Sequence, residues 1–268
     1  MHSLDSFFES IQLPVMPEVA HALIRTLNDD NASVMEVRNI IAQDPVLSAQ
    51  LLRLANSAHF GLPRGVGTLD EAIAMVGMAQ VRSLSLCTCI SAALPTLPGL
   101  NRTAFWQSNM ACAGYAQWLA SKLGMDAQQA WLTGMMLRLG ELLIGQADPE
   151  LLREIEKLPH QPGVRWERET RLTGFTEGQI TAELARRWNF PMQIVQALQR
   201  SSDPLTEQAF SRLGSVVHLA SLLADMPYSG PDMIDALPQE VMDSFQVDVQ
   251  WMRDDFPPAE SFVDLAIA

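Results

Sequence analysis

The sequence predicts an all-α, multi-helix protein, and three observations support this fold class. Residues typical of helix N-caps recur along the chain, and apolar residues spaced three and four positions apart follow them, as in amphipathic helices. Strand signals are scarce, because there are only two tyrosines, few alternating runs and no Asn-Gly or Asp-Gly hairpin turn. Hydrophobic residues make up 48% of the 268 residues, which is enough for a sizeable core.

Short capping sequences mark the first helices. Residues 33–36 (SVME) and 68–71 (TLDE) match the capping box, in which the first hydroxyl accepts from a free backbone N–H and the glutamate reaches back. Asp44-Pro45 matches an N-cap followed by proline at the first helical position. Apolar residues at helical spacing follow each signal, so we expect one helix after each.

Similar signals continue through the second half of the chain. We expect Asp126 to cap one long helix that runs through Ile144, and Asp148-Pro149 to open the next. Residues 176–179 (TEGQ) resemble a capping box. Asp203-Pro204 is expected to open the helical stretch that carries the apolar residues Leu213, Val216, Val217 and Leu223.

The clearest internal break is the proline-containing run at 94–99 (LPTLPG). It predicts an N-terminal helical lobe over residues 1–98 and a second helical lobe over residues 99–225, packed together. Residues 226–268 form a third part, which we expect to be an acidic helical segment with short, irregular pieces around its prolines.

The charge of the chain narrows the function classes. Lys and Arg number 18 against 31 Asp and Glu, a net charge of −13 that disfavours general nucleic-acid binding and attraction to anionic membranes. Residues 225–268 hold ten of the acids and only one base, Arg253. We interpret this segment as a solvated face that maintains solubility; a docking surface for a basic partner is the alternative.

Cysteine usage and hydropathy predict a cytoplasmic protein that does not insert into membranes. Three cysteines make no disulfide framework, and the N-terminal residues contain acids and no apolar signal-peptide core. Common hydrolase and nucleotide-binding motifs are absent, and the five histidines and three cysteines lack metal-ligand spacing. The sequence therefore indicates no cofactor.

A polar loop after the helix that opens at Pro45 is the first candidate site. It contains Asn56, Ser57, His59, Phe60 and Arg64. We favour a structural role, because Asn and Ser side chains satisfy free backbone groups where helices end. The alternative is an interaction loop that presents His59, Phe60 and Arg64 to a partner protein.

Arg138 is the second candidate, because it falls on an apolar stripe with Trp131, Met135 and Leu142. A guanidinium in such surroundings requires a carboxylate or a bound anion. We expect an internal salt bridge to Glu141, one turn further on, with a bound anion as the alternative.

Several motifs together resemble the HDOD domain, a bacterial signalling module related to the HD metal-dependent phosphohydrolases. They are Leu13-Pro14-x-Met16-Pro17, Gln43-Asp44-Pro45, residues 51–61 with Asn56-Ser57-Ala58-x-Phe60-Gly61, Ala72-Ile73, Gly77, Gly134 with Gly140, and Arg187-Trp188-x-x-Pro191. The resemblance covers about residues 10–225. It implies an HD-like helical bundle with an N-terminal helical lobe.

The resemblance also implies that the metal ligands of the HD enzymes are lost. By alignment, Ser108 stands at the early histidine, Leu137-Arg138 at the His-Asp doublet and Ser221 at the distal aspartate. Ser201-Ser202 stands at a later histidine pair, and only Glu177 could still bind a metal. Leu137 has no lone pair to offer, and Arg138 places a permanent positive charge where a cation would bind.

These substitutions imply a non-catalytic, stand-alone HDOD protein that acts through contacts with signalling proteins and is compatible with homo-oligomers. One alternative is a nucleotide or anion sensor that uses the vestigial pocket of Ser108, Leu137, Arg138, Glu141 and Glu177. Residual phosphohydrolase activity at a rearranged site is a further alternative. The step from family to function is an analogy with relatives.

Overall fold

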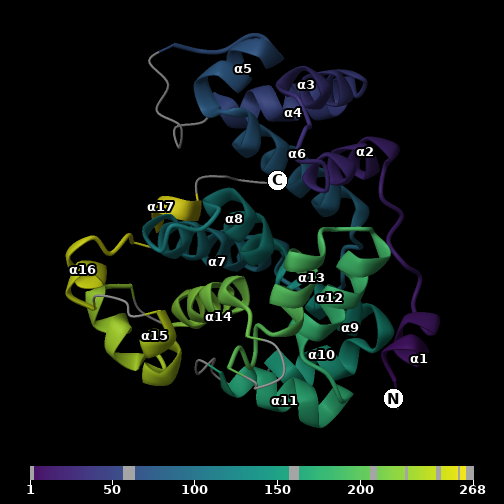
Figure 1. The fold of residues 1–268 in the computed structure, drawn as a ribbon. Coiled ribbons are helices and arrows are strands. Elements are labelled where there is room, and N and C mark those ends of the chain that lie inside the picture. Colours follow the sequence, from purple (N-terminus) through teal and green to yellow (C-terminus); the bar gives the residue numbers. More distant parts are fainter. Residues whose placement is uncertain are drawn as a thin grey trace.

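A computed structural model describes residues 3–56, 64–156, 163–205, 210–226, 229–245, 249–258 and 260–263. The regular elements in these ranges are helices, and none of the described residues lies in a strand, so the predicted all-α class is confirmed. Figure 1 shows α2 to α6 as an upper layer above a larger helical bundle, with the C-terminal helices on one side of that bundle.

The helices of the N-terminal part are short apart from the last. They are α1 (Leu4–Glu9), α2 (Glu18–Leu27), α3 (Val34–Ala42), α4 (Pro45–Ala55), α5 (Leu69–Val76) and α6 (Met78–Ala93). In the part of the chain that is described, no single helix is long and apolar enough to cross a membrane, although α5 and α6 together reach that length across a bend of 116°.

The larger bundle is built around α7, the longest helix. Its members are α7 (Arg102–Lys122), α8 (Ala127–Met136), α9 (Leu139–Ala147), α10 (Pro149–Glu156), α11 (Val164–Thr173), α12 (Glu177–Arg187), α13 (Met192–Gln199) and α14 (Arg212–Asp225). The C-terminal segment adds η2 (Pro231–Ala236), α15 (Gln239–Phe245), α16 (Val249–Asp254) and α17 (Glu260–Val263).

Most of the predicted helix starts are confirmed by their side-chain caps. Both halves of the capping box form at Thr68 and at Thr176, and the Ser33 hydroxyl accepts from the Glu36 N–H at 3.1 Å. The Asp44 and Asp126 carboxylates each accept two backbone N–H groups of the helix that follows. Local sequence therefore sets where these helices begin.

Two helix predictions are wrong. The stretch from Asp126 to Ile144 is not one helix, because α8 ends at Met136 and α9 starts at Leu139. The helix expected after Asp203-Pro204 starts at Arg212 instead, with Ser211 as its N-cap. Residues 203–205 lie in a turn, where the Asp203 N–H donates to the Arg200 carbonyl at 3.1 Å.

Helix α6 joins the two layers and is buried along most of its length. It packs against α2, α4 and α5 on the N-terminal side and against α8 of the larger bundle. Arg82 on α6 donates to the Thr26 carbonyl at 2.9 Å, and Asn28 donates to the Asn189 carbonyl at 3.0 Å. These two bonds secure α2 against both α6 and the turn after α12.

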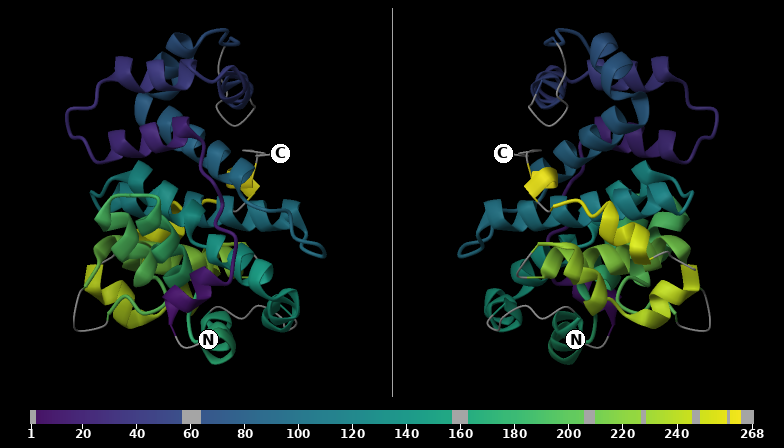
Figure 2. Two further views of the ribbon diagram at one scale, coloured as in Figure 1. Left: turned by 90° about the vertical axis from the view of Figure 1, so that its right-hand side faces the viewer. Right: turned by 90° about the vertical axis from the view of Figure 1, so that its left-hand side faces the viewer.

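The first helix lies away from the other N-terminal helices. Figures 1 and 2 show α1 low on the molecule, beside the larger bundle and on the opposite side of it from α3, α4 and α5. Arg187 on α12 holds it there, with its guanidinium 4.7 Å from the ring centre of the buried Phe8 and 3.4 Å from the Asp5 carboxylate. The N-terminal residues therefore contribute to both layers.

Candidate functional site

Leu137-Arg138, which the sequence predicts to replace the His-Asp doublet, lies at the break between α8 and α9. Leu137 and Arg138 separate the two helices, and Leu137 is completely buried. The Thr181 hydroxyl of α12 donates to the Leu137 carbonyl at 2.9 Å and accepts from the Gly140 N–H at 2.7 Å. One side chain thus satisfies two backbone groups that the break leaves without helical partners. The break directs the Arg138 side chain out of the helical stripe that the sequence predicts.

Arg138 forms an internal salt bridge, but its partner is not Glu141. Its guanidinium pairs with the carboxylate of Asp225, the last residue of α14. Both side chains are only 7% exposed, so each charge is compensated inside the protein. The expected Arg138–Glu141 pair is wrong: the two residues lie one turn apart at the start of α9, but Glu141 contacts Arg165 instead.

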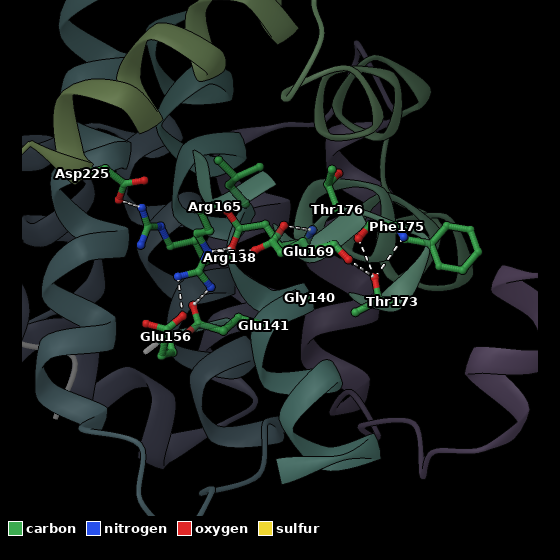
Figure 3. A network of polar contacts seen from close by, with 12 residues as sticks. Arg138, Gly140, Glu141, Glu156, Arg165, Glu169, Thr173, Phe175, Thr176 and Asp225 are labelled. Atoms are coloured by element: carbon green, nitrogen blue, oxygen red, sulfur yellow. Dashed lines mark hydrogen bonds and ion pairs between the residues drawn. The ribbon is translucent and has the colours of Figure 1, made fainter. Parts of the chain in front are cut away.

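Glu141 belongs to a second cluster, which we call the Arg165 cluster (Arg165, Glu141, Glu156, Glu169 and Glu177). The Arg165 guanidinium is 2% exposed and lies 3.0 Å from Glu141, 2.5 Å from Glu156, 2.8 Å from Glu169 and 3.4 Å from Glu177. Figure 3 shows the two arginines side by side, with Arg138 directed to Asp225 and Arg165 directed to the glutamates.

Four carboxylates around one guanidinium leave an excess of negative charge if all are ionised. Burial raises the pKa of Glu141 to about 7, with Arg165 opposing the shift and Glu156 and Glu177 adding to it. Burial, and then the neighbouring Glu177, raise the pKa of Glu169 to about 8. Burial lowers the pKa of Arg165, but the surrounding carboxylates outweigh it and leave the pKa well above its ordinary value.

A pocket of about 390 Å³ opens above these charges. Ser108 of α7, Arg138, Glu141, Glu156, Arg165 and Asp225 form its polar wall, and Leu100 and Phe105 are among its apolar residues. The structure therefore brings together three of the five residues predicted for the vestigial pocket, namely Ser108, Arg138 and Glu141. Leu137 and Glu177 are completely buried and do not line it.

Sequence reasoning missed Arg165, Glu156, Glu169 and Asp225. Arg165 and Glu169 are spaced i, i+4 on α11, a pattern that usually marks an exposed ion pair and therefore attracts no notice. Asp225 is the last residue of the apolar helix α14. In the sequence it is one of ten acidic residues between 225 and 268, and nothing distinguishes it from the others. No sequence signal near either residue indicates its partner.

The residues at this site do not fit a metal ion. At the doublet, Leu137 offers no donor atom and Arg138 contributes a fixed positive charge. The nearby carboxylates contact the Arg165 guanidinium instead, and in the described ranges no group of three His, Cys, Asp or Glu residues is placed to hold a metal. Two serines stand at other positions that the resemblance aligns with metal ligands. Ser221 is buried in α14, and the Ser201 hydroxyl donates to the Leu198 carbonyl at 2.8 Å.

The candidate interaction loop is described only at its ends. Ser57, His59 and Phe60 lie outside the described residues, and Arg64 is exposed. Asn56 closes the loop: its side chain donates to the Leu52 and Val66 carbonyls, both at 2.8 Å, and accepts from the Val66 N–H at 2.7 Å. Asn56 therefore has the structural role that the sequence favours.

Comparisons with known proteins identify the family and the fold. A model of the HDOD domain family matches residues 13–204. A candidate phosphohydrolase of Shewanella amazonensis SB2B has the same fold with a TM-score of 0.80 and 27% identity, covering 99% of this chain and 97% of that one. An HDOD domain protein of unknown function from Geobacter sulfurreducens superposes with a TM-score of 0.67 and 19% identity, covering 98% of this chain and 87% of that one.

Two further relatives are longer proteins. A candidate signal transduction protein of Marinobacter aquaeolei VT8 has a TM-score of 0.70 and 22% identity, covering 97% of this chain and 60% of that one. A curated relative of Treponema pallidum, itself without an assigned function, is 22% identical over 239 residues, or 88% of this chain; the chain spans 46% of that protein's length. With most of its length matched by the family model, this chain belongs to the HDOD domain family.

Proposed function

We propose that this HDOD protein is a non-catalytic signalling module that acts through protein–protein contacts. The observation that carries the proposal is the pair of buried arginines at the vestigial metal position. Arg138 and Arg165 already supply the positive charge there, and carboxylates compensate both. The carboxylates that could bind a divalent cation already contact a guanidinium group, so a metal ion would have to displace Arg138 or Arg165 from them.

Membership of the HDOD family supports a role in signalling, and the Marinobacter neighbour is named as a candidate signal transduction protein. The Shewanella neighbour is named as a candidate phosphohydrolase, so enzymatic activity is the competing proposal. We propose the loop between α4 and α5 as the site for a partner, because Arg64 is exposed and the Asn56 side chain bonds the backbone of Val66 across the loop.

An anion or nucleotide sensor is a second candidate, because the pocket of about 390 Å³ is lined by two guanidinium groups. The same contacts argue against it. Arg138 is paired with Asp225, and Arg165 is surrounded by four carboxylates, so an incoming phosphate would have to replace Asp225 and enter next to Glu141 and Glu156. We therefore rank this function below protein binding.

The enzymatic alternative is tested by measuring phosphodiester turnover of the purified full chain with Mg²⁺, Mn²⁺, Fe²⁺ or Ni²⁺. We expect no turnover above that of the buffer, and no thermal stabilisation by the metals or by nucleotides. Metal-dependent turnover that disappears in Glu177→Gln would contradict the non-catalytic proposal. A nucleotide-induced stabilisation that disappears in Arg138→Ala would favour the sensor.

The interaction itself is tested with a photo-crosslinking amino acid in place of Arg64, and with the same amino acid in place of the exposed Glu150 on α10 as a matched control. We expect a discrete crosslinked partner in the native cells from position 64 and none from position 150. Equal crosslinking at both positions would count against the loop as the contact site.

A further inference from the structure

The C-terminal segment, which we define as the described residues between 249 and 263, lies along α7 (Figure 1). Aromatic rings form the contact. The ring centres of Trp251 and Trp118 are 5.3 Å apart, and Phe256 lies 5.7 Å from both Trp118 and Tyr115. Phe262 meets Tyr115 edge to face at 5.1 Å. The residues of this contact belong neither to the pocket at Arg138 nor to the loop at Asn56.

Gly114 provides a notch in α7 for one of these rings. A Cβ atom built on Gly114 would lie 2.2 Å from two ring carbons of Phe262, so no other residue leaves room for the ring at this position. Glycine inside a helix is unfavourable compared with alanine, because the unfolded chain has more freedom to lose. The notch therefore accommodates an aromatic side chain at a cost to the stability of α7.

The polar part of the contact is small and exposed. Lys122 at the end of α7 pairs with Asp255 at 3.3 Å and lies 5.1 Å from the Trp251 ring centre. Both partners of this ion pair are about half exposed, and such pairs contribute little to stability. Among the described residues, no backbone hydrogen bond joins the C-terminal segment to α7. Side-chain contacts therefore hold the segment against α7.

We propose that this surface of α7 (Gly114, Tyr115, Trp118 and Lys122) is a docking surface for a short acidic segment of a partner protein that carries aromatic side chains. The chain's own C-terminal segment covers it when the partner is absent. The proposal rests on the proposed function, a module that binds proteins, and assigns a second contact surface apart from the loop between α4 and α5.

Charge and shape both indicate this partner chemistry. Helix α7 contains no acidic residue, and Lys122 is its basic residue at this surface. The segment that covers it contains three acids, Asp254, Asp255 and Glu260, against one base, Arg253. The covering segment thus shows what the surface accepts: an aromatic ring for the notch, a second ring for Trp118, and a carboxylate for Lys122.

The test measures binding of a fluorescein-labelled peptide with the sequence of residues 249–263 to the full-length protein by fluorescence anisotropy. Because the covalently attached segment competes, we expect weak binding to the wild type. In the double variant Phe256→Ala/Phe262→Ala, the attached segment loses two of its ring contacts with α7. We expect this variant to bind the peptide more tightly than the wild type by about tenfold or more. No gain in this double variant would overturn the proposal.

Two further variants test the location of the peptide. Lys122→Glu, added to the double variant, reverses an exposed charge and should weaken peptide binding several-fold without affecting the fold. Gly114→Leu, added to the double variant, fills the notch and should abolish binding, with circular dichroism as the check on folding. Binding unchanged by Lys122→Glu would overturn the proposed surface.

The other occupant of this surface is a second copy of the chain, which would exchange its segment. Size-exclusion chromatography with light scattering distinguishes the cases, because exchange would give a wild-type dimer that the double variant loses, and that result would overturn the proposal. If the peptide does not bind and no metal-dependent turnover is found, the docking surface is refuted and the proposed signalling function is not. If metal-dependent turnover is found and the peptide binds, the non-catalytic function is refuted and the docking surface is supported.

Discussion

At the scale of single residues, Arg165 organises the site more than any residue that the sequence singles out. It is completely surrounded by the protein and contacts carboxylates from α9, α10, α11 and α12. The Glu177 N–H also donates to Glu169 at 2.7 Å, which connects α12 to the same cluster. A single cation thus joins four helices at the base of the pocket.

Replacing Arg165 with methionine should destabilise the fold by about 3–5 kcal/mol, because it leaves buried carboxylates without a counter-charge. Urea denaturation followed by circular dichroism measures the change in the free energy of unfolding. Arg153→Met on α10 is the control: Arg153 is mostly exposed and pairs with the exposed Glu150, so its loss should change stability by less than about 0.5 kcal/mol. Equal effects of both substitutions would contradict the central role of Arg165.

The raised pKa values of Glu141 and Glu169 predict a pH dependence of stability. A carboxyl with a raised pKa holds its proton more tightly in the folded protein than in the unfolded chain. Its stabilising contribution is complete below the ordinary pKa of 4.5 and is lost as the pH rises through about 7 for Glu141 and about 8 for Glu169. The free energy of unfolding should therefore decrease from about pH 4.5 to about pH 8 and level off above it.

The measurement compares wild type with Glu169→Gln by urea denaturation across this pH range. Glutamine cannot ionise, so the variant should lose less stability than the wild type as the pH rises. Exposed Glu150→Gln serves as the control and should retain the wild-type pH dependence. An identical pH profile for wild type and Glu169→Gln would contradict the raised pKa.

At the scale of elements, the break between α8 and α9 determines the geometry of the site. The apolar sequence from Ala127 to Ile144 favours a continuous helix, but α12 packs against α9 at Gly140, where an added Cβ would lie 2.2 Å from the Glu177 carbonyl oxygen. Thr181 then satisfies the backbone groups at the break. Tertiary packing overrides helix propensity here, and Arg138 faces Asp225 as a result.

Removing the Thr181 hydroxyl should therefore weaken this junction. Thr181→Val keeps the shape but leaves the Gly140 N–H and the Leu137 carbonyl buried without partners, at a cost of about 2–4 kcal/mol. Thr181→Ser retains the hydroxyl and removes one methyl group, so it should cost only about 1 kcal/mol. Thermal and urea unfolding of both variants measure the difference, and a smaller loss for valine than for serine would refute the role of these bonds.

At the scale of the whole molecule, residues distant in sequence hold the layers together. Arg187 of α12 secures α1 through Asp5 and Phe8, and Asn28 connects α2 to the turn after α12. The N-terminal residues therefore wrap around the larger bundle as well as forming the upper layer in Figure 1.

Arg187→Ala should release α1 without disturbing the upper layer. Hydrogen–deuterium exchange of residues 4–9 should become faster, because the cation–π contact with Phe8 and the ion pair with Asp5 are lost, while α3 to α5 exchange as in the wild type. Arg186→Ala is the matched control, since the ion pair of Arg186 is with Glu183 of its own helix. Faster exchange of α1 in both variants would show that Arg187 has no specific role.

Sequence alone determined the helical class and most helix starts, and it predicts that Leu137-Arg138 replaces a metal-binding doublet. These features depend on a few neighbouring residues, because caps, apolar spacing and side-chain chemistry act locally. Only the tertiary structure decided the partners of the buried charges and the covering of Gly114 by Phe262. Arg138 and Asp225 are 87 positions apart, and in a fold with several carboxylates within reach, packing selects the one that each guanidinium meets.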